Sequence, residues 1–186
     1  SSDLDRRVWL NPVSTGGKIQ RLEGHGAEIT ALTFSSNSQL LATGAQDKTV
    51  RIWDIRSGKE LHRLEGHSGD ILGLAFGLDG RTIISTSVDR TVRSWQLDSK
   101  LPRVRIDEFP VEAVSVSVSA DGRLLALGMK DGEISIINTQ THRSVWQRKG
   151  HKQSVRTLAF DAEGRVLASG ADDGSLQICE AATGKL

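Results

Sequence analysis

The sequence predicts an all-β protein built from small antiparallel sheets that stack on one another. Two observations carry this prediction: one pattern recurs every 42 residues, and each copy alternates apolar strands with tight turns. Gly-His dipeptides follow this spacing at residues 24–25, 66–67 and 150–151, with one copy absent at Glu108-Phe109. Aspartates follow it without an insertion, at Asp5, Asp47, Asp89, Asp131 and Asp173.

Each unit is expected to be a four-stranded antiparallel meander. In the unit that starts at His25, the expected strands are Ile29–Phe34, Leu40–Thr43, Thr49–Asp54 and Glu60–Leu64. The first turn recurs as Asp79-Gly80, Asp121-Gly122 and Glu163-Gly164, and Asp-Gly between apolar runs is a strong hairpin signal. Because both faces of the inner strands are apolar, each sheet must be covered on both sides by its neighbours. This is typical of a propeller blade or a solenoid rung.

The repeat divides the chain into five parts. Residues 1–24 hold the last two strands of a preceding unit, Arg7–Leu10 and Lys18–Glu23. Residues 25–66, 67–108 and 109–150 are complete units, the third of them degenerate, and residues 151–186 are an incomplete fourth.

Composition excludes several classes of protein. The chain has 186 residues and a formal net charge of +1, so no strong field attracts it to nucleic acid or to an anionic membrane. Cys179 is the single cysteine, which excludes an intrachain disulfide and an all-cysteine zinc site. No apolar run approaches the roughly 20 residues of a membrane span. We therefore expect a soluble, cytoplasmic protein.

Several motifs together resemble the WD40 repeat. They are Gly24-His25, Leu41-Ala42-Thr43-Gly44 and residues 47–54, and the next unit nearly repeats them. The resemblance extends over residues 5–186. It implies a β-propeller, usually of seven blades, that acts as a non-catalytic platform for protein–protein interaction. This chain would supply three complete blades and two partial ones.

The resemblance also implies a buried hydrogen-bonded tetrad in each blade. The first is expected at His25, Thr43, Asp47 and Trp53, and the second at His67, Ser85, Asp89 and Trp95. The third unit has Phe109, Leu127, Asp131 and Ile137 at these positions, so three polar members are replaced by apolar residues together. Replacing hydrogen-bonded partners together changes stability little, whereas removing one of them leaves the others unsatisfied. The last unit keeps His151, Ser169 and Asp173 but has Cys179 for the tryptophan, and we expect a weaker network there.

A partner surface is expected at the narrow entrance of the propeller. One set of residues leads into the innermost strands: Glu28, Asp70, Glu112 and Ser154. A second set precedes the repeat aspartates: Gln46, Val88, Lys130 and Asp172. Three acids among the first four residues form an acidic ring, which favours a basic peptide or an Arg/Lys-bearing partner segment.

No catalytic, cofactor or metal site is predicted. Cys179 replaces a buried tryptophan and is interpreted as an inert apolar residue, and the glycines match neither a Walker loop nor a dinucleotide fingerprint. Two functions stay open: an interaction scaffold, or the sensing or autoinhibitory part of a larger ATPase, kinase or protease.

The number of blades raises a question of closure. A seven-bladed ring with this repeat needs about 290 residues, more than are present. We expect the chain to be part of a longer propeller. The alternatives are a four-bladed ring in which Lys18–Glu23 completes the last blade, and association with another copy.

Overall fold

The structure is a computed structural model that describes residues 6–11, 19–98 and 103–186. Every regular element within these ranges is a β-strand, which confirms the all-β prediction. None of the described residues forms a helix of the length and apolarity that a membrane span requires.

The strands form one hairpin and four larger sheets, which we call blades 1 to 4. The N-terminal hairpin consists of β1 (Arg7–Leu10) and β2 (Gln20–Glu23). Blade 1 consists of β3 (Ile29–Phe34), β4 (Leu40–Ala45), β5 (Val50–Asp54) and β6 (Glu60–Leu64). Blade 2 consists of β7 (Ile71–Phe76), β8 (Thr82–Ser87), β9 (Thr91–Gln96) and β10 (Arg103–Glu108). Blade 3 consists of β11 (Ala113–Val118), β12 (Leu124–Met129), β13 (Glu133–Asn138) and β14 (Ser144–Lys149). Blade 4 consists of β15 (Val155–Phe160), β16 (Val166–Ala171) and β17 (Leu176–Glu180).

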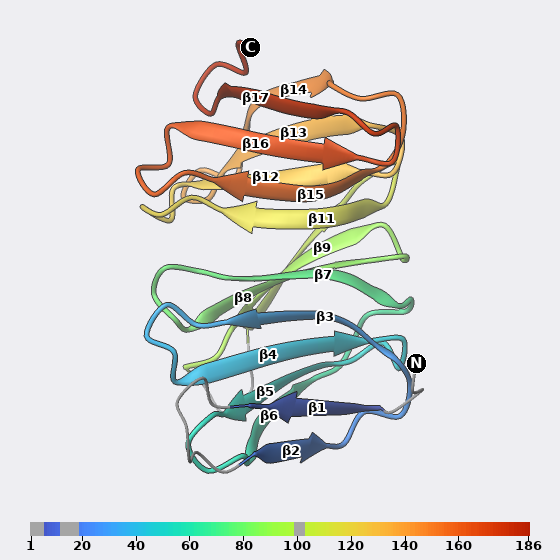
Figure 1. Cartoon of the computed structure of the whole chain (residues 1–186), viewed down its shortest axis with the longest axis vertical. Coiled ribbons are helices and arrows are strands. Elements are labelled where there is room, and N and C mark those ends of the chain that lie inside the picture. Colours follow the sequence, from blue (N-terminus) through green and yellow to red (C-terminus); the bar gives the residue numbers. More distant parts are fainter. Residues whose placement is uncertain (1–5, 12–18, 99–102) are drawn as a thin grey trace.

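Each blade is an antiparallel meander in which strands pair in the order of the chain. The blades stack in the same order, from the hairpin at one end of the molecule to blade 4 at the other (Figure 1). The innermost strands β3, β7, β11 and β15 lie side by side. The second strand of blade 1 extends to Ala45, two residues beyond the predicted Leu40–Thr43, and its neighbour starts at Val50 rather than Thr49.

The turns at Asp79-Gly80, Asp121-Gly122 and Glu163-Gly164 have the backbone conformation that their glycines predict. Gly80, Gly122 and Gly164 adopt φ angles of 61°, 72° and 70°, a region that favours glycine. Ser38 takes the same conformation in blade 1, with φ at 56°.

The core lies between blades, and the same repeat positions build the first two interfaces. Between the hairpin and blade 1, Leu10 and Leu22 pack with Trp53. Between blades 1 and 2, the residues one repeat later, Ile52, Leu64 and Trp95, pack in the same way. Two aliphatic side chains from one blade therefore enclose the tryptophan of the next.

The outermost strand of blade 2 departs from this pattern. Val50, Val92 and Ile134 are equivalent positions on the third strands of blades 1, 2 and 3. On the outermost strands, Val50 pairs with Leu64 and Ile134 pairs with Arg148, at equivalent positions. In blade 2, Val92 pairs with Asp107 and not with the equivalent residue Ile106. β10 is thus shifted by one residue. Because side chains alternate between the two faces of a strand, a shift by one residue turns every side chain to the opposite face. Ile106 is 47% exposed, whereas its counterpart Leu64 is 3% exposed.

Glu108 explains the shift. At the end of β14, the backbone N–H groups of both Gly150 and His151 donate to the carbonyl of Gly132, so that Gly150 is one residue in excess. In blade 2, Glu108 occupies the position of this glycine and pairs directly with Thr91, and Phe109 N–H donates to Arg90. Blade 2 therefore has no extra residue at this point, and the pairing of β10 with β9 is displaced by one residue relative to the other blades.

Both ends of the stack are uncovered. Leu176 and Ile178 on β17 are 70% and 56% exposed, whereas Ile52 and Ile136, at the repeat position of Ile178, are fully buried. At the opposite end, Leu32 and Phe34 on β3 are 57% and 50% exposed. These two faces therefore expose apolar side chains at both ends of the open set of blades.

The alternative of a closed four-bladed ring is wrong. It required residues 18–23 to complete blade 4, but β2 pairs with β1, and blade 4 consists of β15, β16 and β17. The hairpin packs against blade 1, because Leu22 is buried beside Leu41 and Trp53. Lys18 lies outside the described residues.

Candidate functional site

The first two blades each contain a chain of buried hydrogen bonds. In blade 1, the Nδ1 and Nε2 atoms of His25 lie 2.9 Å from Asp47 and 2.7 Å from Thr43. The indole N–H of Trp53 donates to the Thr43 hydroxyl at 2.9 Å. The network therefore joins the loop before β3 to β4, β5 and the turn between them.

Blade 2 repeats this network. His67 lies 2.8 Å from both Asp89 and Ser85, and Trp95 donates to the Ser85 hydroxyl at 2.9 Å. A neutral histidine with its proton on Nδ1 satisfies every bond of this network: Nδ1–H donates to the aspartate, and the hydroxyl accepts from the indole and donates to Nε2. Burial lowers the pKa of both His25 and His67, which favours this neutral form.

The aspartate at the end of each chain is held in its ionised form. Burial acts to raise the pKa of Asp47, but hydrogen bonds from the Thr49 hydroxyl, the Gly26 N–H and His25 outweigh it and hold that pKa at about 2. The Ser175 hydroxyl and the Lys152 N–H likewise lower the pKa of Asp173 to about 2.

Sequence reasoning missed a fifth member of each network. Thr49 and Thr91 donate to Asp47 and Asp89 at 2.7 Å. The signal was available, because a hydroxyl residue follows the repeat aspartate by two positions in three of the four units, at Thr49, Thr91 and Ser175.

The networks of blades 3 and 4 differ from these. In blade 4, His151 bonds Ser169 at 2.8 Å and Ser175 at 2.6 Å, and Ser175 in turn donates to Asp173. The histidine no longer bonds the aspartate directly, since the closest ion-pair distance is 3.8 Å. Cys179 is buried in the tryptophan position, and burial raises its pKa. In blade 3, Phe109, Leu127 and Ile137 form one apolar cluster.

The expected partner-binding residues lie in pairs at the ends of the inner strands. The backbone N–H of the residue before each repeat aspartate donates to the carbonyl of the residue that leads into the inner strand. The four pairs are Gln46–Glu28 at 2.9 Å, Val88–Asp70 at 3.0 Å, Lys130–Glu112 at 2.9 Å and Asp172–Ser154 at 3.0 Å. We call these eight residues the rim.

The charges of the rim are only partly free. Lys130 forms an ion pair with Glu112 at 2.7 Å, and Arg156 forms one with Asp172 at 2.8 Å. The side-chain amide of Gln46 donates to Glu28 at 3.1 Å, which leaves the Glu28 charge in place. The negative charge of the rim is therefore concentrated at Glu28 and Asp70, on the neighbouring blades 1 and 2.

Two features of the rim differ from the sequence-based picture. Ser154 is 7% exposed and offers a partner little surface. Arg156 was not singled out, although it is the only charged residue at its repeat position, where the other units have Thr30, Leu72 and Val114. Within the described ranges, no cluster of His, Cys, Asp or Glu has the form of a metal site.

Comparison with protein families finds two matching models. The model described as "WD domain, G-beta repeat" matches residues 16–54 and 58–96. The model described as "Anaphase-promoting complex subunit 4 WD40 domain" matches residues 124–186. Together the matched segments cover most of the chain.

Individual relatives match shorter segments. Periodic tryptophan protein 2 homolog of Schizosaccharomyces pombe is 46% identical over 48 residues, which is 26% of this chain and 6% of that protein. Nuclear distribution protein nudF 1 of Talaromyces marneffei is 38% identical over 55 residues, 30% of this chain and 12% of that protein. The matches thus span only a small part of these relatives.

A solved structure has the same fold. The β-propeller domain of Cps50 (Swd1) from Myceliophteria thermophila superimposes with a TM-score of 0.79 at 19% sequence identity. The match covers 87% of this chain and 55% of that one.

Proposed function

Because this chain belongs to the WD40 repeat family, we propose that it is a non-catalytic, intracellular platform for protein–protein interaction that binds a basic segment of its partner. The observation that supports this most is the free negative charge of Glu28 and Asp70 on adjacent blades. Blades that are locked by buried hydrogen bonds hold these carboxylates on a rigid support. Complementary charge then contributes to the rate and specificity of association.

The position of the charge limits where a partner binds. Glu112 and Asp172 are already neutralised by Lys130 and Arg156, so the blade 3 and blade 4 part of the rim offers little attraction to a cation. The basic segment would therefore bind over blades 1 and 2.

Binding of a fluorescein-labelled peptide of alternating Arg and Ser tests this proposal. Glu28→Gln with Asp70→Asn is expected to weaken binding at least several-fold, and added salt is expected to weaken it further. The matched control is Glu65→Gln with Glu163→Gln, which removes two exposed carboxylates that are not among the eight rim residues. Equal losses in the two double variants, or no loss in the first, would contradict the proposal.

We also propose that the two apolar end faces pack against further blades of a longer propeller, with a second copy of the chain as the alternative. Leu176 and Ile178 occupy positions that are buried between blades elsewhere in the molecule. Light scattering of the chain is expected to show association, and Leu176→Lys with Ile178→Lys is expected to reduce it. A monodisperse monomer of the unaltered chain would contradict this proposal.

A further inference from the structure

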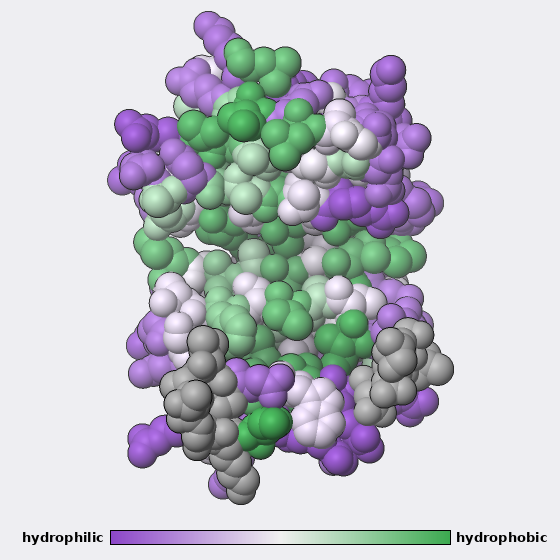
Figure 2. Space-filling model, viewed as in Figure 1, coloured by the Kyte–Doolittle hydropathy of each residue, from purple (hydrophilic) through white to green (hydrophobic). Residues whose placement is uncertain are grey.

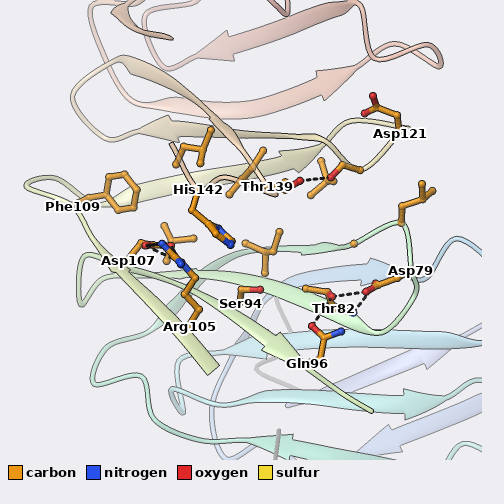
Figure 3. Close-up of a pocket in the computed structure, with 18 residues that line it drawn as sticks. Asp79, Thr82, Ser94, Gln96, Arg105, Asp107, Phe109, Asp121, Thr139 and His142 are labelled. Carbon is orange, nitrogen blue, oxygen red and sulfur yellow. Dashed lines mark hydrogen bonds and ion pairs between the residues drawn. The ribbon is translucent and has the colours of Figure 1, made fainter. Parts of the chain in front are cut away.

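A cavity of about 610 Å³ lies between blades 2 and 3. Blade 2 contributes Ile84, Val92 and Ser94, and the facing wall of blade 3 contributes Leu125 and Ile137. His142 and Arg105 extend toward the same space from opposite blades (Figure 3). Apolar side chains also gather on the surface over this junction, at the waist of the molecule (Figure 2).

The cavity exists because the residues at three repeat positions leave space between blades 2 and 3. Ile52, Leu64 and Trp95 close the interface between blades 1 and 2. Their counterparts between blades 2 and 3 are Ser94, Ile106 and Ile137. Serine and isoleucine are smaller than the residues they replace, and Ile106 is turned outward by the shift of β10. The space is therefore preformed, and its facing walls carry the apolar side chains of Ile84, Val92, Leu125 and Ile137.

The charged groups along the cavity already have partners. Arg105 and Asp107 bond each other at 3.1 Å. Asp79 accepts hydrogen bonds from Thr82 and from the Arg81 N–H, and Asp121 accepts from Ser119 at 2.6 Å. Asp79 and Asp121 keep their negative charges because these hydrogen-bond donors are neutral, but they lie in the β7–β8 and β11–β12 turns rather than on the facing sheets. These charges disfavour an anion, and the apolar side chains on the facing sheets favour a neutral ligand.

We propose that this cavity binds a neutral, largely apolar small molecule. Its volume falls within the roughly 300–1,000 Å³ typical of small-molecule sites. The ligand occupies the space that aliphatic and indole side chains fill in the preceding interfaces, and it contacts both blades at once. Because its walls are two facing sheets, the cavity can enclose a small molecule, whereas the flat surface of a partner protein could not enter it.

Fluorescence titration with N-phenyl-1-naphthylamine, a neutral aromatic probe, tests the proposal. Ser94→Ile places in the cavity the side chain that blades 1 and 3 carry at this position, as Ile52 and Ile136. It is expected to fold normally, to melt at a higher temperature, and to lose at least one saturable binding component. Ser94→Ala is the matched control, since it leaves the space open and is expected to retain that component.

The uncovered apolar end faces are also expected to bind such a probe, but both variants leave these faces unchanged. The difference between Ser94→Ile and Ser94→Ala therefore reports the cavity alone. Identical titrations for the two variants, with both folded by thermal melt, would overturn the proposal, as would the absence of saturable binding to the unaltered chain.

Discussion

The interface between blades 1 and 2 is filled, whereas the interface between blades 2 and 3 contains a cavity, although both are built from the same repeat. Leu64 is 3% exposed in the first, and its counterpart Ile106 is 47% exposed beside the second. Ile106 is as apolar as Leu64, and its position in the sequence pattern is the same. The difference arises from Glu108, two residues later, which replaces a bulge-forming glycine. A change at the end of a strand can thus decide which residues enter an interface.

The largest expected effect is a difference in unfolding free energy between the same substitution at Leu64 and at Ile106. Leu64→Asp is expected to lower the free energy of unfolding by about 3–5 kcal/mol, because it empties a filled interface and buries a charge. Ile106→Asp is expected to change it by no more than about 0.5 kcal/mol, because the side chain faces solvent. Urea denaturation of both variants measures the contrast. An Ile106→Asp cost close to that of Leu64→Asp would show that β10 pairs in the register of blades 1 and 3.

Restoring the glycine should remove the difference between the interfaces. In a Glu108→Gly background, the bulge can form, β10 can return to the register of the other blades, and Ile106 then faces blade 3. Ile106→Asp is expected to cost about 2–4 kcal/mol in this background, again by urea denaturation. A cost that stays as small as in the unaltered chain would contradict the role of Glu108.

The buried networks give a smaller contrast between the same blades. Ser85→Ala in blade 2 is expected to cost about 1–3 kcal/mol, because it leaves both His67 and Trp95 without their shared partner. The triple change His67→Phe, Ser85→Leu and Trp95→Ile copies blade 3 and removes all three partners together. It is expected to cost less than the sum of its single changes. Strict additivity in denaturation experiments would contradict the cooperative network.

The smallest expected effect is a dependence on pH. Burial lowers the pKa of His25 and His67 below the ordinary value of 6.5, so the unfolded chain binds more protons below that pH. Their contribution to stability is complete above pH 6.5 and decreases as the pH falls toward the folded-state pKa. Asp47 adds a further loss below its unfolded pKa of about 4, which continues down to about 2.

Denaturation midpoints at several pH values measure this effect. Replacing both His25 and His67 with phenylalanine, the residue that blade 3 has as Phe109, is expected to flatten the slope between pH 7 and pH 5. An unchanged slope would assign the pH dependence to other groups.

The sequence by itself determined the β class, the 42-residue repeat, the order of the strands and the residues of the first two hydrogen-bonded networks. The first three features follow from local patterns, namely apolar runs between tight turns that recur every 42 residues, whereas the network residues follow from the resemblance to the WD40 repeat. The repeat also indicated the two sets of residues that form the rim, and the structure showed how they pair.

Only the tertiary structure decided the charges of the rim, the outward position of Ile106 and the cavity. Whether Glu112 is free depends on how closely Lys130 approaches it, and spacing along the chain does not fix a distance between side chains. The cavity depends on residues of two blades and on the register of β10, the outermost strand of blade 2. A regular 42-residue pattern predicts this register incorrectly. A strand alternates its faces with every residue, so pairing shifted by one position reverses what the pattern predicts to be buried.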